Sequence, residues 1–125
     1  MSAAAKVLLV DDDPKMRALL RLSMGDHFAL LEANNGQEGL DACRAEKPSL
    51  VLLDLMMPVM DGLEACRQLK QDPATRDIIV IMLTARDSRD DVRQAKEAGA
   101  DDYITKPFSP RALLDAVVAR IEARP

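Results

Sequence analysis

Aromatic side chains are almost absent from this sequence. Its 125 residues include two Phe, one Tyr and no Trp, although hydrophobic residues as a whole make up 48%. Surfaces that bind single-stranded nucleic acid by stacking need several aromatic rings, so the composition excludes that class of surface. The core must therefore be aliphatic, built from Leu, Val, Ile, Ala and Met.

Cysteine, histidine and long apolar runs are scarce as well. The two cysteines, Cys43 and Cys66, are too few for a disulfide scaffold or a zinc site, and the single His27 belongs to no metal-binding motif. The longest aliphatic run, 78–83, has six residues, whereas a membrane-spanning helix needs about 18. The N-terminus carries no signal-peptide-like stretch. We therefore expect a cytoplasmic protein without membrane contact.

Positive charge is in deficit. The 17 Lys and Arg face 21 Asp and Glu, which gives a net charge of −4. This balance argues against nucleic-acid binding through bulk charge and is compatible with cation binding. Three of the acidic residues stand in a row, as Asp11, Asp12 and Asp13.

Short apolar runs alternate with longer amphipathic segments along the chain. Most runs show little in–out alternation, which indicates strands buried on both faces. The five runs are 6–10, 28–33, 50–53, 78–83 and 103–105. Five strands alternating with five helices predict a single α/β domain with a doubly wound parallel sheet. The flavodoxin-like strand order 2-1-3-4-5 is the commonest for this count.

Capping residues predict where four of the helices begin. An Asp, Asn or Ser followed by proline, or by Glu three residues later, is typical of a helix N-terminus. These caps are Asp13, Asn35, Asp61 and Ser109, and Gly99 suits a helix end. The segment 87–98 has Val92 as its one large aliphatic residue, so we expect a weakly anchored helix there.

Polar residues follow four of the predicted strands. Asp11 and Asp12 end the first strand, Asp54 the third, Thr84 the fourth and Lys106 the fifth. Ligands of such sheets bind at the carboxyl ends of the strands, near the point where the strand order reverses. Three carboxylates, a hydroxyl and an ammonium group are therefore expected to converge in one crevice, which packing alone does not require.

The chemistry of these groups points to a cation and a phosphoryl group. Crowded carboxylates repel one another and are relieved by protons or by a hard cation. Oxygen ligands without thiolate or imidazole favour Mg²⁺, Mn²⁺ or Ca²⁺ over zinc. A bound cation together with a lysine is how proteins hold a transferring phosphoryl group, and an aspartate can accept that group as an acyl phosphate.

Four stretches of the chain carry a resemblance to a known family. They are VLLVDDD (7–13), VLLDLMMPVMDG (51–62), IIVIMLTA (78–85) and GADDYITKPF (99–108). Together they resemble the receiver domain of response regulators, the CheY-like domain of two-component signalling. The resemblance spans essentially the whole chain, so we expect residues 1–125 to form one receiver domain with a (βα)5 fold.

The resemblance implies a role for each site residue. Asp54 would be the phosphoacceptor and a ligand of Mg²⁺ or Mn²⁺. Asp12 would bind the metal directly and Asp11 would bind it through water or assist, while the backbone carbonyl of Met56 would complete the protein ligands. The remaining implied residues are Thr84 and Lys106 on the phosphoryl oxygens, Tyr103 as the aromatic switch that moves with Thr84, and a cis peptide bond between Lys106 and Pro107.

The resemblance also implies partners. A histidine kinase or a histidine phosphotransfer protein would donate the phosphoryl group. The output would be a downstream effector protein, or an effector domain beyond the C-terminus, with no direct contact to nucleic acid. A phosphorylation-dependent population shift would alter the surface of helix 87–98, strand 102–106 and the last helix. Receivers often dimerise through the last two helices, so a homodimer is one option.

Three rival functions compete with this hypothesis. A phosphatase with an aspartate nucleophile usually needs a second acid two residues later, where this chain has Met56, and a cap domain for which no residues remain. A flavin binder needs a phosphate-binding loop after the first strand, where this chain has three carboxylates. A degenerate receiver that only binds partners is disfavoured because all the acceptor-site residues are present. We therefore expect a signalling module that catalyses its own phosphorylation and slow dephosphorylation, not a metabolic enzyme.

Overall fold

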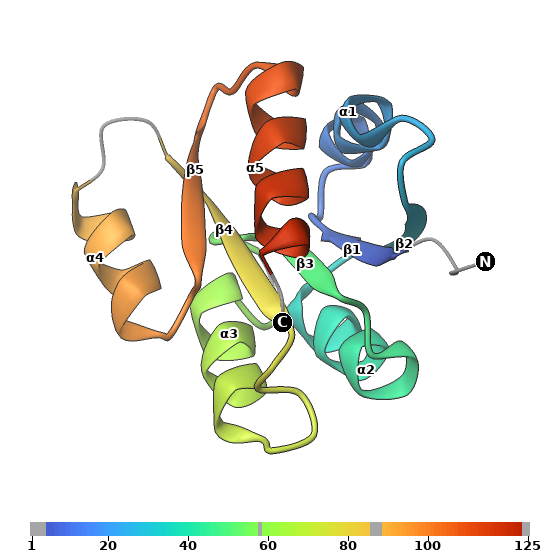
Figure 1. Ribbon diagram of the computed structural model, residues 1–125. Helices are drawn as coiled ribbons and strands as arrows, with labels where there is room; N and C mark the ends of the chain where they lie inside the picture. The colour runs from blue at the N-terminus through green and yellow to red at the C-terminus, as the bar shows by residue number, and fades with distance from the viewer. Residues whose placement is uncertain (1–4, 58, 86–88, 124–125) are drawn as a thin grey trace.

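Five strands alternate with five helices along the chain, as the sequence predicts (Figure 1). The structure is a computed structural model that describes residues 5–57, 59–85 and 89–123. The strands are β1 (Lys6–Val10), β2 (Ala29–Ala33), β3 (Leu50–Asp54), β4 (Ile79–Ala85) and β5 (Asp102–Lys106). The helices are α1 (Pro14–Met24), α2 (Gly36–Glu46), α3 (Gly62–Gln71), α4 (Arg89–Glu97) and α5 (Pro110–Glu122).

The sheet is entirely parallel and its order is β2-β1-β3-β4-β5, which confirms the predicted flavodoxin-like fold. Its pairing runs to the carboxyl ends of the strands, where Asp54 lies opposite Leu83 and Thr84 opposite Thr105. β1 has the predicted bounds and β2 begins after Phe28, whereas β3, β4 and β5 extend beyond the predicted apolar runs. The hydrogen-bonded ladder uses peptide groups, so it continues through polar residues that end an apolar run.

Helices cover both faces of the sheet. One core lies between the sheet and α1 with α5, and the other lies between the sheet and α2, α3 and α4 (Figure 1). Both cores are almost wholly aliphatic, as the shortage of aromatic residues requires. The fully buried strand residues on the α1 and α5 side include Val7, Leu9, Leu50, Leu52 and Ile81; those on the other side include Leu8, Val10, Val51, Leu53 and Met82.

The predicted helix signals are confirmed where the structure describes them. The caps Asp13, Asn35, Asp61 and Ser109 each accept a hydrogen bond from a backbone amide of the first turn. Gly99, beyond the end of α4, has a φ of +97°. Each cap satisfies an amide that the helix itself leaves without a partner.

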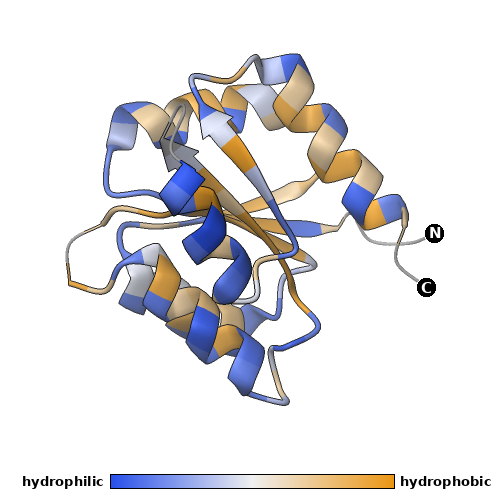
Figure 2. Cartoon of the chain, turned by 90° about the vertical axis from the view of Figure 1, so that its left-hand side faces the viewer, coloured by the Kyte–Doolittle hydropathy of each residue, from blue (hydrophilic) through white to orange (hydrophobic). Residues whose placement is uncertain are grey.

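α4 is the weakly held helix that the sequence predicts. Ala95 is the one buried residue within its described range, Arg89–Glu97. The helix lies on the side that faces the viewer in Figure 2, where it is coloured hydrophilic over most of its length. Residues 87 and 88 of the predicted segment lie outside the described residues. Little apolar burial opposes a displacement of this helix.

The two cysteines are free and buried. Burial raises the pKa of Cys43 to about 12 and that of Cys66 to about 11. Both thiols therefore stay protonated and act as small apolar core residues. In the part of the chain that the structure describes, no helix is long and apolar enough to cross a membrane.

The loop from β3 to α3 is tightly built around Asp54. A Cβ atom at Gly62 would lie 2.2 Å from the backbone oxygen of Asp54, so this position requires glycine. Val59 in the same loop has a φ of +70°, in the left-handed region, and is 84% exposed. A β-branched residue is strained there, and the exposed Val59 side chain gains little packing in return.

We predict that Val59→Gly stabilises the protein. A left-handed backbone costs an ordinary residue roughly 1–2 kcal/mol, and glycine's larger entropy in the unfolded chain offsets part of that gain. The free energy of unfolding in urea should rise by roughly 0.5–1 kcal/mol. Val59→Ala is the control, because it removes the same exposed side chain but keeps a Cβ; it should gain much less. A variant Val59→Gly that is less stable than the wild type would contradict the strain.

Candidate functional site

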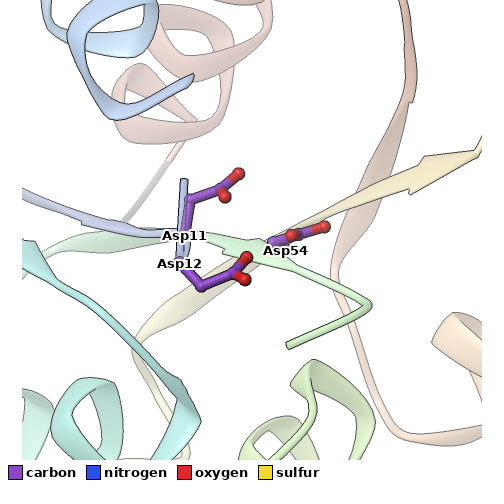
Figure 3. Close-up of side chains that lie close together, drawn as sticks. All are labelled: Asp11, Asp12 and Asp54. Atoms are coloured by element: carbon purple, nitrogen blue, oxygen red, sulfur yellow. The ribbon is translucent and has the colours of Figure 1, made fainter. Parts of the chain in front are cut away.

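The predicted site residues meet at the carboxyl edge of the sheet. Asp11 and Asp12 follow β1 directly, Asp54 is the last residue of β3, and Lys106 is the last of β5. Asp11, Asp12 and Asp54 each place one carboxylate oxygen within 4.8 Å of the others. Figure 3 shows the two side chains from the end of β1 beside Asp54, which lies on the neighbouring strand. Residues more than forty positions apart thus form one acidic cluster.

Asp11 is the most deeply buried member of the cluster, with 1% of its surface exposed. Its Oδ1 atom accepts a hydrogen bond of 2.9 Å from the backbone amide of Asp13. Its Oδ2 atom is buried and has no hydrogen-bond partner among the described residues. A buried carboxylate oxygen without a donor is costly, so this atom is ready to take a cation or a proton.

Lys106 supplies the positive charge of the site. Its Nζ atom donates a hydrogen bond of 3.0 Å to Asp54 Oδ1 and lies 3.6 Å from Asp11 Oδ2. The Lys106 side chain is 28% exposed, so the ammonium lies between the buried carboxylates and solvent. The peptide bond from Lys106 to Pro107 is cis, as the family resemblance implies.

Burial dominates the electrostatics of both buried carboxylates. The pKa of Asp54 is raised above its ordinary value, first because burial disfavours the charge and to a lesser extent because Asp12 is near. The Lys106 ammonium and the backbone amide of Met56 act in the opposite direction on the same pKa. The pKa of Asp11 is also raised, chiefly by burial and further by the charges of Asp54 and Asp12. Both carboxyls are therefore harder to ionise here than in water, and an additional positive charge would favour their ionised forms.

Thr84 lies at the same edge of the sheet, and Tyr103 lies further back. Thr84 is 1% exposed, and its Oγ1 atom has no hydrogen-bond partner among the described residues. Tyr103 is half-buried against the core under α2, α3 and α4, opposite Met82, and Lys96 Nζ lies 5.6 Å from the centre of its ring. The structure thus brings Thr84 to the acidic edge and leaves Tyr103 at the boundary between core and surface.

The donor set fits a hard divalent cation. The cluster offers three carboxylates, with neither imidazole nor thiolate among them, and one buried oxygen that lacks a donor. Such oxygen sets suit Mg²⁺ and Mn²⁺. Met56 lies two residues beyond Asp54, with its side chain exposed; the metal-binding role of its backbone carbonyl remains a prediction.

One contact to the cluster is missed by the sequence analysis. Arg17 in α1 donates a hydrogen bond of 2.6 Å to the backbone oxygen of Asp11. The side chain binds a backbone atom, so no pattern of residue types marks the contact. The spacing from the Asp13 cap is the available signal, because it puts Arg17 one helical turn into α1.

Comparison with known proteins decides the family. The model of the response regulator receiver domain matches residues 7–118. The chain belongs to this family. It is a receiver domain of two-component signalling, as its four sequence stretches predict.

Named relatives of this receiver include transcriptional regulatory proteins and a chemotaxis protein. It is 45% identical over 118 residues to the phosphate regulon transcriptional regulatory protein PhoB of Pseudomonas aeruginosa, covering 94% of this chain and 50% of that protein. It is also 45% identical to the transcriptional regulatory protein ResD of Bacillus subtilis, covering 94% of this chain and 47% of that protein. The receiver thus spans about half the length of these curated relatives. The structure of the chemotaxis protein CheY4 of Vibrio cholerae matches with a TM-score of 0.86 at 29% identity, covering 94% of this chain and 98% of that one.

We predict that Asp54→Asn stabilises the metal-free receiver at neutral pH. Burial holds the folded-state pKa of Asp54 above its ordinary value of 3.8, so stability is lost as the pH rises through that window. The variant has no carboxyl at this position and escapes the loss. In buffer with a chelator, its free energy of unfolding at pH 7 should exceed the wild-type value by about 1 kcal/mol, and the difference should shrink as the pH falls toward 3.8.

Asp26→Asn is the control for this comparison, because Asp26 is exposed. It should stay within about 0.5 kcal/mol of the wild type at each pH. A metal-free Asp54→Asn variant that is less stable than the wild type at pH 7 would show that the ion pair with Lys106 outweighs burial.

Proposed function

We propose that this receiver accepts a phosphoryl group on Asp54 from a phosphohistidine partner and thereby switches a protein-binding surface. The observation that carries the proposal is the contact of 3.0 Å between Lys106 Nζ and Asp54 Oδ1 inside an acidic cluster. A carboxylate held by an ammonium, beside other carboxylates, suits the transfer of an anionic group better than it suits structural packing. The partner would be a histidine kinase or a histidine phosphotransfer protein.

The transfer step uses Asp54 as the nucleophile. A carboxylate oxygen of Asp54 attacks phosphorus, and a P–O bond forms while the P–N bond to the donor imidazole breaks. The electron pair of that bond stays on the imidazole nitrogen, which takes a proton from solvent. Lys106 faces the phosphoryl oxygens and stabilises their charge. The Thr84 hydroxyl donates a hydrogen bond to one of these oxygens, which gives its buried Oγ1 atom a partner.

Mg²⁺ or Mn²⁺ is the proposed cofactor. Asp11, Asp12 and Asp54 would hold it, together with the backbone carbonyl of Met56. When bound, the cation neutralises charge on the carboxylates and on the transferring phosphoryl group, so that two anionic groups can approach each other. The buried Asp11 Oδ2 atom, which has no hydrogen-bond partner among the described residues, supports this assignment.

The proposed response lies on α4, β5 and α5. Thr84 and Lys106 sit at the ends of the adjacent strands β4 and β5, so a phosphoryl group that engages both biases the position of these strands. A groove of about 230 Å³ opens on this side of the molecule, lined by residues that include Lys96, Tyr103 and Arg120. Because α4 buries little, a small preference of a few kcal/mol for one conformation is enough to shift the population. Tyr103, as the switch residue, would change rotamer with Thr84.

The wider setting follows from the relatives. PhoB and ResD are named as transcriptional regulatory proteins, and the receiver spans about half of each. We propose that residues 1–125 act as one receiver domain in the cytoplasm. Its output goes to a downstream effector protein or to an effector domain beyond this chain, and a homodimer is an option for the phosphorylated form. The receiver itself would make no direct contact with nucleic acid.

Phosphorylation by a small phosphodonor tests the function. The protein is incubated with acetyl phosphate or phosphoramidate and weighed intact. We expect one phosphoryl adduct per chain with Mg²⁺, none with a chelator, and none for Asp54→Asn. An adduct that survives in Asp54→Asn, or the absence of any adduct in the wild type with Mg²⁺, would overturn the proposal.

A matched pair of variants tests the metal site. Asp12→Asn and Asp13→Asn remove the same charge from adjacent exposed positions, and asparagine caps a helix as well as aspartate does. Asp12→Asn should lower the initial rate of Mg²⁺-dependent adduct formation at least 10-fold, by loss of a ligand. Asp13→Asn should stay close to the wild type. Equal rates for the two variants would contradict the role of Asp12.

A further inference from the structure

Arg17 makes a contact with the acidic cluster that the proposed transfer step does not use. Its guanidinium donates a hydrogen bond of 2.6 Å to the backbone oxygen of Asp11, and its side chain is 15% exposed. The contact reaches the backbone between the two carboxylates that follow β1. Arg17 therefore restrains the direction in which the chain leaves β1. Its hydrogen bond goes to a backbone oxygen of the cluster and not to a carboxylate.

Arg17 is in turn held by β2. Its Nε atom lies 3.1 Å from Glu32 Oε1, and Arg21 Nη1, one turn further along α1, lies 2.7 Å from the same oxygen. The two arginines therefore share one carboxylate on the edge strand. They differ because Arg17, besides its contact with Glu32, also donates a hydrogen bond to the backbone oxygen of Asp11.

The turn that carries the carboxylates is fixed at three points. The Asp11 amide donates to the Ala33 oxygen at 3.2 Å, the Asp13 amide donates to Asp11 Oδ1 at 2.9 Å, and Arg17 holds the Asp11 oxygen. The first two contacts fix one amide and one carboxylate oxygen. The third fixes the peptide group that joins Asp11 to Asp12, and so the angle at which the Asp12 carboxylate faces Asp54.

Repulsion between the carboxylates of the cluster explains why the contact of Arg17 with the Asp11 backbone matters. The carboxylates of Asp11, Asp12 and Asp54 place oxygens within 4.8 Å of one another, so their negative charges are crowded. In the absence of a cation, these charges push the β1–α1 turn away from Asp54. A hydrogen bond from a charged donor to the backbone of the turn opposes that movement. Because it goes to a backbone oxygen, it leaves the carboxylate oxygens free to bind the cation.

We propose that Arg17 is a positioning residue that clamps the Asp11–Asp12 peptide and so preorganises the cation site. The inference rests on the proposed function, since it assigns Arg17 a role toward the Mg²⁺ of that site. Residues that orient metal ligands typically contribute about 10–100-fold to metal affinity. The prediction concerns affinity for the metal alone, before any phosphodonor is present.

Arg17→Met and Arg21→Met form the matched pair for the test. Each variant removes one of the two arginines that pair with Glu32. Arg17→Met also removes the hydrogen bond to the backbone oxygen of Asp11. Mg²⁺ binding is measured by titration calorimetry on the full chain. We expect Arg17→Met to weaken Mg²⁺ affinity about 10-fold, and Arg21→Met to stay within about twofold of the wild type. Urea unfolding in chelator reports whether the two variants lose similar stability.

A third variant guards against a loss of fold. Arg17→Lys keeps the positive charge and a single donor nitrogen, so it should bind Mg²⁺ with an affinity between those of the wild type and Arg17→Met. If Arg17→Met does not fold, Arg17→Lys is compared with Arg21→Lys, and a weaker affinity in Arg17→Lys alone is the expected result. Equal affinities within either pair would overturn the role of Arg17 while leaving the proposed function intact. A wild-type protein that binds no Mg²⁺ would overturn both.

Discussion

One ammonium group lies between two carboxylates buried at the end of a parallel sheet, and the rest of the site depends on this arrangement. Lys106 Nζ is 3.0 Å from Asp54 Oδ1 and 3.6 Å from Asp11 Oδ2. Burial still dominates, since the pKa of each carboxyl is raised. The folded protein places three carboxylates beside one ammonium at this edge, so negative charge is in excess there when the carboxylates are ionised. A divalent cation is the kind of ligand that this imbalance favours, and the cation together with Lys106 would offset the charge of a phosphoryl group.

The fold connects that edge to the surface proposed to respond. β5 ends at Lys106, and it begins at Asp102, which pairs with Arg120 of α5 at 3.3 Å. β4 carries Thr84 next to its end and lies between β3 and β5. Because α4 buries only Ala95 within its described range, the two strands border on the least anchored helix. The groups at the carboxyl edge therefore lie on strands that adjoin a helix with little apolar burial to oppose its displacement.

Much of the architecture could be predicted from the sequence, since apolar runs, caps and their spacing are local signals. The helix starts at Asp13, Asn35, Asp61 and Ser109 are all confirmed, and so is the strand order. The apolar runs stop before the ends of β3, β4 and β5, because a polar residue ends an apolar run but not a hydrogen-bonded ladder. The positions of the acidic residues relative to the apolar runs likewise predict which strands end in carboxylates. That these carboxylates lie close together follows from the strand order.

Other features of the site could not be predicted, because they depend on backbone atoms. The clamp of Arg17 on the Asp11 oxygen involves no complementary side chain. The left-handed backbone at Val59 has no local signal, since valine is not a residue that favours it. Gly62 is required by the closeness of its backbone to the Asp54 oxygen, a distance that only the folded loop defines.

Asp54 is the residue proposed to carry the phosphoryl group, and chemical trapping can locate that group on the chain. Borohydride reduces an aspartyl phosphate to homoserine, which tandem mass spectrometry locates in the peptide sequence. After incubation of the receiver with Mg²⁺ and a phosphodonor, we expect homoserine at position 54. Homoserine at position 11 or 12 instead, or none in a sample whose intact mass shows the adduct, would contradict it.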